Sequence, residues 1–495
     1  MEVIALHDIR KEVDAKYVGF MPNGGAIKPV HIAGGSLRCI YGKCNTSKGI
    51  KKLALVADSK GNIPNGNEIE AIYRECIEDE KIEESVEAGS LESMRNVMQR
   101  MLSADKGVYV VKGLKDNMLS YSAGSKYFIT KKSMYEDTGE FIGGLVRTYC
   151  PKLADYLYNL LEKAYDPISI LFSPVLSDET EEYSTEYRHE DIPAFSAPNA
   201  TMQWYIGGLR AAGECLLKNF ERHPNPLTQL RIFNFFCIFQ IMRYITLLEA
   251  FYCSGSVRPI LLDFSMLPPN KSSVARSSEM SYTQMHKSIN RFYAWGYSQQ
   301  LCEDGYSIET LLSSVPVYDK NKAPSKAVQD ELNTLWNIAK EHAAEAENSE
   351  EAYLAIGEAM YDMLALVASS HPVNFVKTLG TSAGILYPPD AMHPNKRFVI
   401  SQDILEMLLR ASVEPGEIIS GQEIRERVWN RFGAVIGGSQ FELDKLQRSG
   451  FILQVDEDAL ESNFAKFASM LENMDFAEIM ADGILQIRLG GNEVR

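Results

Sequence analysis

A glycine-rich stretch at residues 34–44 contains the residue types of a phosphate-binding loop. The spacing does not fit that chemistry, because no glycine lies five residues before Gly42 and Cys44 stands where a Ser or Thr would hold magnesium. Cys39, Cys44 and the nearby His31 are also types of residue that bind zinc, but no second pair of ligands follows them. We therefore interpret the stretch as a glycine-rich loop and expect neither a nucleotide nor a metal there.

Residues 380–384 match the Gly-x-Ser-x-Gly pattern that surrounds the serine nucleophile of many hydrolases. That nucleophile requires a strand before it and a helix after it, and Pro388 and Pro389 would stop such a helix almost at once. The nearest partners for a triad, Asp390 and His393, lie in the same proline-rich stretch. We interpret these residues as a turn in a linker and assign no catalytic residue.

Three acidic residues that are far apart in the sequence, Asp58, Glu190 and Asp263, are candidates for a divergent metal-dependent enzyme. Asp58 and Asp263 each end an apolar stretch that is typical of a strand, and Glu190 lies in an acidic loop. Sequence spacing does not bring the three together and indicates no further ligand. A metal-dependent enzyme is therefore a third hypothesis, and no metal ligand or cofactor is assigned.

The clearest pattern of structural elements spans residues 397–489. Its order is strand, helix, helix, turn, helix, strand, a long insert and a further strand, which is the order of a winged helix-turn-helix. Ser420 and Glu423 form a capping box that starts one helix, and Ser439 and Glu442 form a second box. Two such boxes in the expected order predict a winged-helix-like domain.

Glycines and apolar runs complete this pattern. Gly433 and Gly450 stand where glycine caps end helices. Residues 451–455 are predicted to form a strand that pairs with residues 484–489 as the wing, and residues 459–480 between them one or two amphipathic helices. Such an insert would be unusual in a wing.

Six cations in this segment are candidates for contacts with the phosphates of double-stranded DNA. On the helix that would read the DNA, Glu442 and Asp444 balance the positive charges, and an acidic turn follows at residues 456–458. We therefore favour protein contacts over DNA contacts for this domain. The six candidates are Arg425, Arg427, Arg431, Lys445, Arg448 and Arg488.

The composition indicates a soluble, acidic, cytoplasmic protein. The net charge is −16, so phosphate backbones repel the chain unless its charge is segregated. The N-terminus lacks the basic and apolar regions of a signal peptide, and eight scattered cysteines are typical of free thiols in a reducing compartment. Polar residues interrupt the most apolar stretch, residues 232–252, which predicts a buried helix and no membrane span.

At 495 residues the chain is long enough for several domains. We predict a mainly helical α+β multidomain protein, with a mixed α/β domain at residues 1–135 and a helical central domain at 136–320. A helical hairpin and a proline-rich linker follow at 321–395, and the linker tethers a separately folded winged-helix-like domain at 396–495.

The lead functional hypothesis is a non-catalytic scaffold or adaptor subunit of a larger cytoplasmic assembly, docked to its protein partners through the winged helix. Bacterial multi-gene systems such as antiviral defence contain accessory subunits of this kind. The second hypothesis is a DNA-binding accessory or regulatory protein that uses the same domain.

Overall fold

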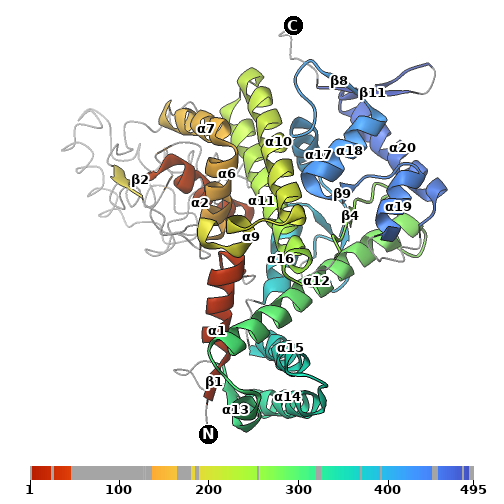
Figure 1. Cartoon of the computed structure of the whole chain (residues 1–495). Coiled ribbons are helices and arrows are strands. Elements are labelled where there is room, and N and C mark those ends of the chain that lie inside the picture. Colours follow the sequence, from red (N-terminus) through yellow and green to blue (C-terminus); the bar gives the residue numbers. More distant parts are fainter. Residues whose placement is uncertain are drawn as a thin grey trace, which may run out of the picture.

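The computed structural model is mainly helical, with several two-stranded sheets and one three-stranded sheet (Figure 1). This confirms the expected mainly helical α+β class. The structure describes residues 3–23, 27–45, 126, 129, 137–163, 180–183, 189–223, 225–253, 256–318, 325–367, 371–390, 393–448, 455–481 and 484–489. Most of the mixed domain predicted at residues 1–135, Asp58 included, lies outside the described residues.

Three long helices form the centre of the molecule: α10 (Ala200–Arg222), α11 (Pro226–Tyr252) and α12 (Ser273–Glu303). Each begins after a side chain that accepts a hydrogen bond from the first turn, which satisfies backbone N–H groups that have no partner within the helix. These capping residues are Asn199, Asn225 and Ser272. The Ser272 cap ends the preceding loop, and α12 begins at the next residue.

α11 is apolar on all sides and is surrounded by other elements. It is long and apolar enough to cross a membrane, but the window that meets this test is 100% buried within the fold. Burial on all sides is the alternative that such a composition allows. The buried helix expected around residues 232–252 is confirmed.

The N-terminal elements pack against this centre. They are β1 (Val3–Ala5), α1 (Leu6–Val13), the π-helix η1 (Asp14–Val18), α2 (Pro29–Tyr41) and β2 (Lys43–Asn45). The stretch at residues 34–44, expected to be a loop, mostly belongs to α2, where its glycines serve helix packing. A Cβ atom on Gly35 would lie 2.7 Å from Cα of Gly139, so the absence of side chains lets α2 approach α6 (Thr138–Tyr149) closely.

The helical central region begins with two helices, α6 and α7 (Pro151–Lys163), which are separated by Cys150. The region around Glu190, expected to be an acidic loop, contains three short elements. These are β3 (Thr180–Glu182), the 3-10 helix η4 (His189–Asp191) and α9 (Pro193–Ser196). β3 pairs antiparallel with β2.

The predicted helical hairpin is confirmed, as α14 (Lys326–Glu345) and α15 (Ser349–Val367). α15 packs along α12, while α13 (Ile308–Ser313) and β5 (Val315–Val317) lead into the hairpin, and β5 pairs parallel with β1. α16 (Pro372–Ser382) follows. The serine of the hydrolase-like stretch, Ser382, ends this helix and does not lie between a strand and a helix.

The remaining elements belong to the C-terminal third. They are β4 (Ile260–Leu261), β6 (Leu386–Tyr387), β7 (Arg397–Phe398), α17 (Gln402–Arg410), β8 (Ile418–Ser420), α18 (Gly421–Phe432), β9 (Ala434–Val435), α19 (Gln440–Arg448), α20 (Glu457–Asn473), β10 (Ala477–Ile479) and β11 (Leu485–Arg488). The capping box at Ser420 starts its helix as predicted, with Glu423 accepting from the backbone N–H of Ser420. The second box forms only in part, since Glu442 accepts from the backbone N–H of Ser439 but its own N–H bonds to the Ser439 carbonyl oxygen. Gly433 ends α18 with a positive φ of 66°.

Residues 396–495 are not a tethered unit, and this part of the prediction is wrong. β9 pairs in parallel with β4 of the preceding region, and one cluster of buried side chains extends from Ile4 to Leu489. The expected linker is also wrong, because β6 and β7 form an antiparallel pair in which Leu386 is 3% exposed. The prolines lie at a largely exposed turn between two paired strands and not in a spacer.

Candidate interaction surface

The last three strands form a sheet in the order β10–β11–β8. β11 is antiparallel to both neighbours, so Gln486 lies opposite Glu478 on one side and Ser420 on the other. Ile418 and Arg488 are paired two residues away. Because side chains two residues apart on a strand point to the same face, all five lie on one face, which we call the outer face.

The two faces of the sheet differ in burial. On β8 and β11 the residues that point away from the outer face contribute to the core and are 2, 8 and 0% exposed: Ile419, Leu485 and Ile487. On β10, Ile479 points the same way and is 45% exposed. On the outer face Ile418 is 59% exposed. By the same alternation Met480 and Ile484 lie on this face near the end of the hairpin, and they are 40 and 54% exposed.

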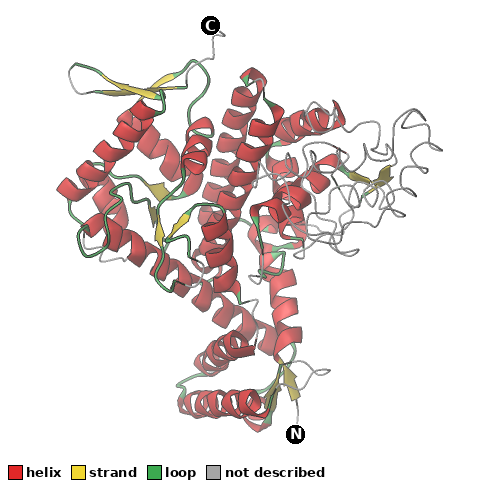
Figure 2. Cartoon of the chain, turned by 180° about the vertical axis from the view of Figure 1, so that it is seen from behind, coloured by secondary structure: helices red, strands yellow, loops and turns green. Residues whose placement is uncertain are grey.

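The three exposed apolar side chains and two charged ones form what we call the docking face: Ile418, Met480, Ile484, Glu478 and Arg488. The hairpin of β10 and β11 extends beyond the helices in both views of the molecule (Figures 1 and 2). Glu478 and Arg488 are 3.9 Å apart, and both side chains are more than 60% exposed, so solvent screens the pair. Grouped apolar side chains on a surface are typical of interaction sites.

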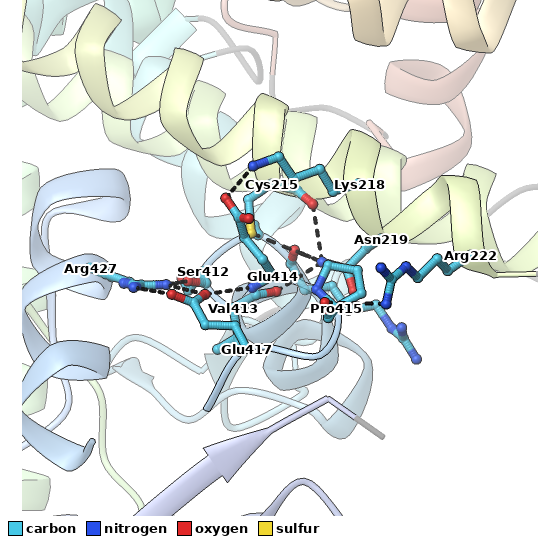
Figure 3. A network of polar contacts seen from close by, with 12 residues as sticks. Cys215, Lys218, Asn219, Arg222, Ser412, Val413, Glu414, Pro415, Glu417 and Arg427 are labelled. Atoms are coloured by element: carbon cyan, nitrogen blue, oxygen red, sulfur yellow. Dashed lines mark hydrogen bonds and ion pairs between the residues drawn. The ribbon is translucent and has the colours of Figure 1, made fainter. Parts of the chain in front are cut away.

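A polar network fixes the loop before β8 to helix α10 (Figure 3). Asn219, which is 3% exposed, donates hydrogen bonds to the carbonyl oxygens of Arg410 and Val413 at 2.8 and 2.9 Å. Lys218, one residue earlier, forms an ion pair of 2.5 Å with Glu414. The start of the docking face is therefore attached to the helical centre.

A second pair holds the same loop against α18. Arg427 donates two hydrogen bonds to the carboxylate of Glu417, at 2.7 and 2.8 Å, and one to the carbonyl oxygen of Ser412 at 2.9 Å. Bidentate pairs of this kind are strong and geometrically specific. The hydrogen bonds from Arg427 hold the pKa of Glu417 at about 2, and the backbone N–H of Glu414 contributes in the same direction.

The cations proposed to contact DNA have partners within the chain wherever their side chains are described. Arg427 binds Glu417, Arg488 is paired with Glu478, and Arg431 donates to the carbonyl oxygen of Ala411 at 2.6 Å.

Arg425 and Lys445 share one acidic partner. Each lies 3.8 Å from the carboxylate of Glu442, which is 3% exposed. The Lys445 ammonium also lies 4.1 Å from the ring centre of Phe441, and burial lowers its pKa despite the attraction of Glu442. Arg448 ends α19, and its side chain lies outside the described residues.

α20 leads directly into the hairpin. Asp456 caps it by accepting from the backbone N–H of Ala459 at 2.8 Å. Its only cation, Lys466, donates to the carbonyl oxygen of Ser265. Its other exposed residues are acidic, small or polar: Asp458, Glu461, Ser462, Ala465, Ser469, Glu472 and Asn473.

The partner predicted for the last strand, residues 484–489, is wrong. The described partners of β11 are β10 and β8, whereas residues 451–454, the expected wing strand, lie outside the described residues. β10 was assigned to a helical insert because its three residues are too short to show strand periodicity.

Of the carboxylates proposed for a metal site, Asp58 lies outside the described residues, and the other two have partners of their own. Asp263 pairs with Arg397 at 3.1 Å, and the carboxylate of Glu190 is 3.7 Å from His189. Among the described residues no group of three or more His, Cys, Asp or Glu is arranged to hold a metal ion. No family model matches this chain, and no curated protein or solved structure is detectably similar to it.

Proposed function

We propose that this protein is a non-catalytic subunit of a larger assembly and that it binds a partner protein through the docking face. The observation that carries the proposal is the apolar part of that face, where Ile418, Met480 and Ile484 are 59, 40 and 54% exposed. Full burial of a side chain of this size contributes about 1.5–3 kcal/mol. Burial of all three side chains would therefore contribute substantially to the free energy of binding in a protein interface.

The order of elements supports the interpretation of this region as a winged helix. α17, β8 and α18 follow one another as helix, strand and helix, α20 comes after the intervening β9 and α19, and the hairpin β10–β11 comes last. The sheet order β10–β11–β8 places the first strand beside the last. α19 is then an addition between two helices, and α20 takes the position of the recognition helix. The fold alone does not choose between DNA and protein partners.

The partner that best fits the docking face has an apolar centre and a positively charged rim. Residues 396–495 contain 17 Asp and Glu against 11 Lys and Arg, so their surroundings attract cations. A second copy of this chain fits less well. Pairing two copies of β10 about its central residue would place two Glu478 side chains opposite each other, and like charges in that position are destabilising.

Double-stranded DNA is the alternative that the charges disfavour. The five candidate cations whose side chains are described all have partners within the chain, and the exposed surface of α20 is acidic. Contacts with phosphates need Lys or Arg side chains that displace the counterions of the DNA, so DNA binding must weaken steeply as salt rises. We expect no mobility shift of a DNA duplex at physiological salt; a shift that disappears in the Arg425→Ala, Lys445→Ala variant would favour DNA instead.

Native co-purification from the source cells tests the proposed docking. We expect the wild-type protein to elute in a complex of fixed stoichiometry, determined by native mass spectrometry. The double variant Ile418→Glu, Ile484→Glu should elute alone, because two buried charges in the interface would each lack a partner.

The matched control is Leu354→Glu, which places the same charge on an apolar side chain of α15 that is 38% exposed. The control should retain the complex, and all three proteins should have similar melting temperatures. The proposal fails if the double variant keeps the partner, or if the wild-type protein at native abundance elutes without one.

A further inference from the structure

Strand β10 forms one edge of the three-stranded sheet. It pairs with β11 on one side, and within the described ranges no strand lies on its other side. The N–H of Arg488 donates to the carbonyl oxygen of Phe476 at 2.9 Å. The N–H of Met480 donates to the carbonyl oxygen of Ile484 at the same distance. The ladder between the two strands, and with it the open edge, therefore extends over residues 476–480.

The pattern of this ladder determines which backbone groups of β10 face the open edge. In an antiparallel pair, residues bonded to the neighbouring strand alternate with residues whose N–H and C=O groups point away from it. Phe476 and Met480 are bonded to β11, so Glu478, midway between them, bonds in the same direction. The N–H and C=O groups of Ala477 and Ile479 therefore point to the open edge.

The opposite edge of the sheet, formed by β8, is engaged by the chain itself. Because Gln486 is bonded to β10, β11 bonds to β8 through Ile487 and its partner Ile419, and the N–H of Ser420 points away. This N–H donates to the carboxylate of Glu423 at 2.7 Å, in the capping box of α18. By contrast, no group in the described part of the chain is bonded to the outward N–H groups of β10.

The side chains along the open edge are apolar on both faces of the sheet. Met480 on the outer face is 40% exposed, and Ile479 on the opposite face is 45% exposed. Edge strands are commonly protected by proline or lysine, and β10 contains neither. Its one charged side chain is Glu478, which is 64% exposed. A strand added at this edge would cover both apolar side chains at once.

We propose that the partner protein adds an extended segment to the sheet as a further strand beside β10, with Lys or Arg opposite Glu478 and an apolar side chain opposite Ile479. The outward groups of Ala477 and Ile479 supply the main-chain hydrogen bonds that give such complexes their affinity. Opposite charges on facing strands stabilise the pair and select the partner. This inference rests on the proposed docking and names the kind of segment that the docking face binds.

Binding of a designed peptide to the full-length protein tests strand addition. The probe is a peptide of about six alternating Lys and Val residues with capped ends, and the matched control alternates Glu and Val. In calorimetric titration the Lys–Val peptide should bind about tenfold more tightly, because its cations face Glu478. At saturation it should slow hydrogen exchange of the Ala477 and Ile479 amides about tenfold or more. The amide of Glu478, already bonded within the sheet, should change little.

Two substitutions separate strand addition from other kinds of contact. Ile479→Pro removes an N–H that faces the open edge, where proline is tolerated, and should abolish peptide binding. Ile479→Ala shortens the same side chain but keeps the N–H, and should still bind. Glu478→Lys should reverse the preference, so that the Glu–Val peptide binds more tightly. The same charge reversal at the exposed Glu341 of α14 is the control and should leave the preference unchanged.

The inference is overturned if the Lys–Val peptide does not bind, if it leaves exchange of the Ala477 and Ile479 amides unchanged, or if Ile479→Pro binds as tightly as Ile479→Ala. Self-association of the protein that Ile479→Pro abolishes would assign the edge to a second copy and overturn it as well. Native co-purification separates the two proposals. If Ile479→Pro keeps the partner that Ile418→Glu, Ile484→Glu loses, the docking stands and strand addition fails; a wild-type protein without a partner contradicts the docking itself.

Discussion

At the scale of single residues, one buried cation links the centre of the molecule to its C-terminal third. Arg243 of α11 donates to the carbonyl oxygens of Asn430 and Arg431 at 3.2 and 2.6 Å. These carbonyls end α18, where the helix dipole favours a positive charge. The guanidinium also lies 4.2 Å from the ring centre of Trp204, and burial lowers its pKa to about 9. Hydrogen bonds and the dipole stabilise the charge without a carboxylate.

Buried histidines make the stability of the protein sensitive to acid. Burial, followed by the charges of Arg10 and His286, lowers the pKa of His371 to about 4. An unfolded histidine has a pKa of about 6.5, so between pH 6.5 and 4 the unfolded state binds more protons than the folded state. The stability that His371 contributes is therefore fully present above pH 6.5 and is lost as pH falls toward 4, by about 2–3 kcal/mol.

Melting temperatures measured from pH 7.5 to pH 4 check this expectation. The wild-type protein should lose stability steeply below pH 6.5, and His371→Gln should show a shallower dependence because it cannot be protonated. His342→Gln, at an exposed position of α14, is the control and should follow the wild type. Parallel curves for the wild type and His371→Gln would rule out His371 as a source of the acid sensitivity.

At the scale of elements, the crossing of α12 and α15 depends on a residue without a side chain. A Cβ atom on Gly357 of α15 would overlap the carbonyl oxygen of Ala294 of α12. Backbone cannot move aside as a flexible side chain can, so the two helices would have to separate. Gly207, on α10, has open space where its Cβ would lie.

The same substitution at these two glycines should have opposite effects. Gly207→Ala should stabilise the protein by about 0.5–1 kcal/mol, because alanine favours a helix interior over glycine. Gly357→Ala gains the same helix propensity but should destabilise the protein by about 1–3 kcal/mol through overpacking. Urea unfolding of both variants measures the difference, and equal stabilisation by both would show that α15 does not pack closely on α12.

At the scale of the whole molecule, segments far apart in the sequence share one core. Asn463 of α20 donates to the carbonyl oxygen of Leu262 at 2.9 Å and accepts from the backbone N–H of Phe264 at 2.8 Å. The carbonyl oxygen of Ile436 accepts from the same amide at 3.2 Å. One buried side chain thus supplies hydrogen-bond partners to backbone groups of two separate segments, which would otherwise have none.

Residues 396–495 expressed alone should not fold into a stable domain. Removing the rest of the chain would expose apolar side chains such as Ile404, Leu408 and Phe432, which are at most 2% exposed in the full-length protein, and would leave β9 without its partner strand. Aggregation or poorly dispersed amide resonances are the expected outcome. A soluble fragment that melts cooperatively would contradict this expectation and support the tethered domain predicted from the sequence.

Local signals in the sequence determined most of the helices in the described regions. The hairpin of α14 and α15, the capping box at Ser420 and the burial of α11 could all be predicted, because each depends on residues within a few turns of one another. The interaction of a cap with its first turn is the same in any fold. Helix positions are therefore largely a property of the sequence.

Only the tertiary structure decided which segments share a core and which polar groups meet. Ile260 pairs with Ala434 through strands of two residues, which are too short for any periodic pattern. Arg425 and Lys445 were candidates for DNA contacts in the sequence, and the fold brings both to Glu442. Such contacts form only when residues far apart in the sequence come together, and no local pattern of residue types predicts which of them will do so.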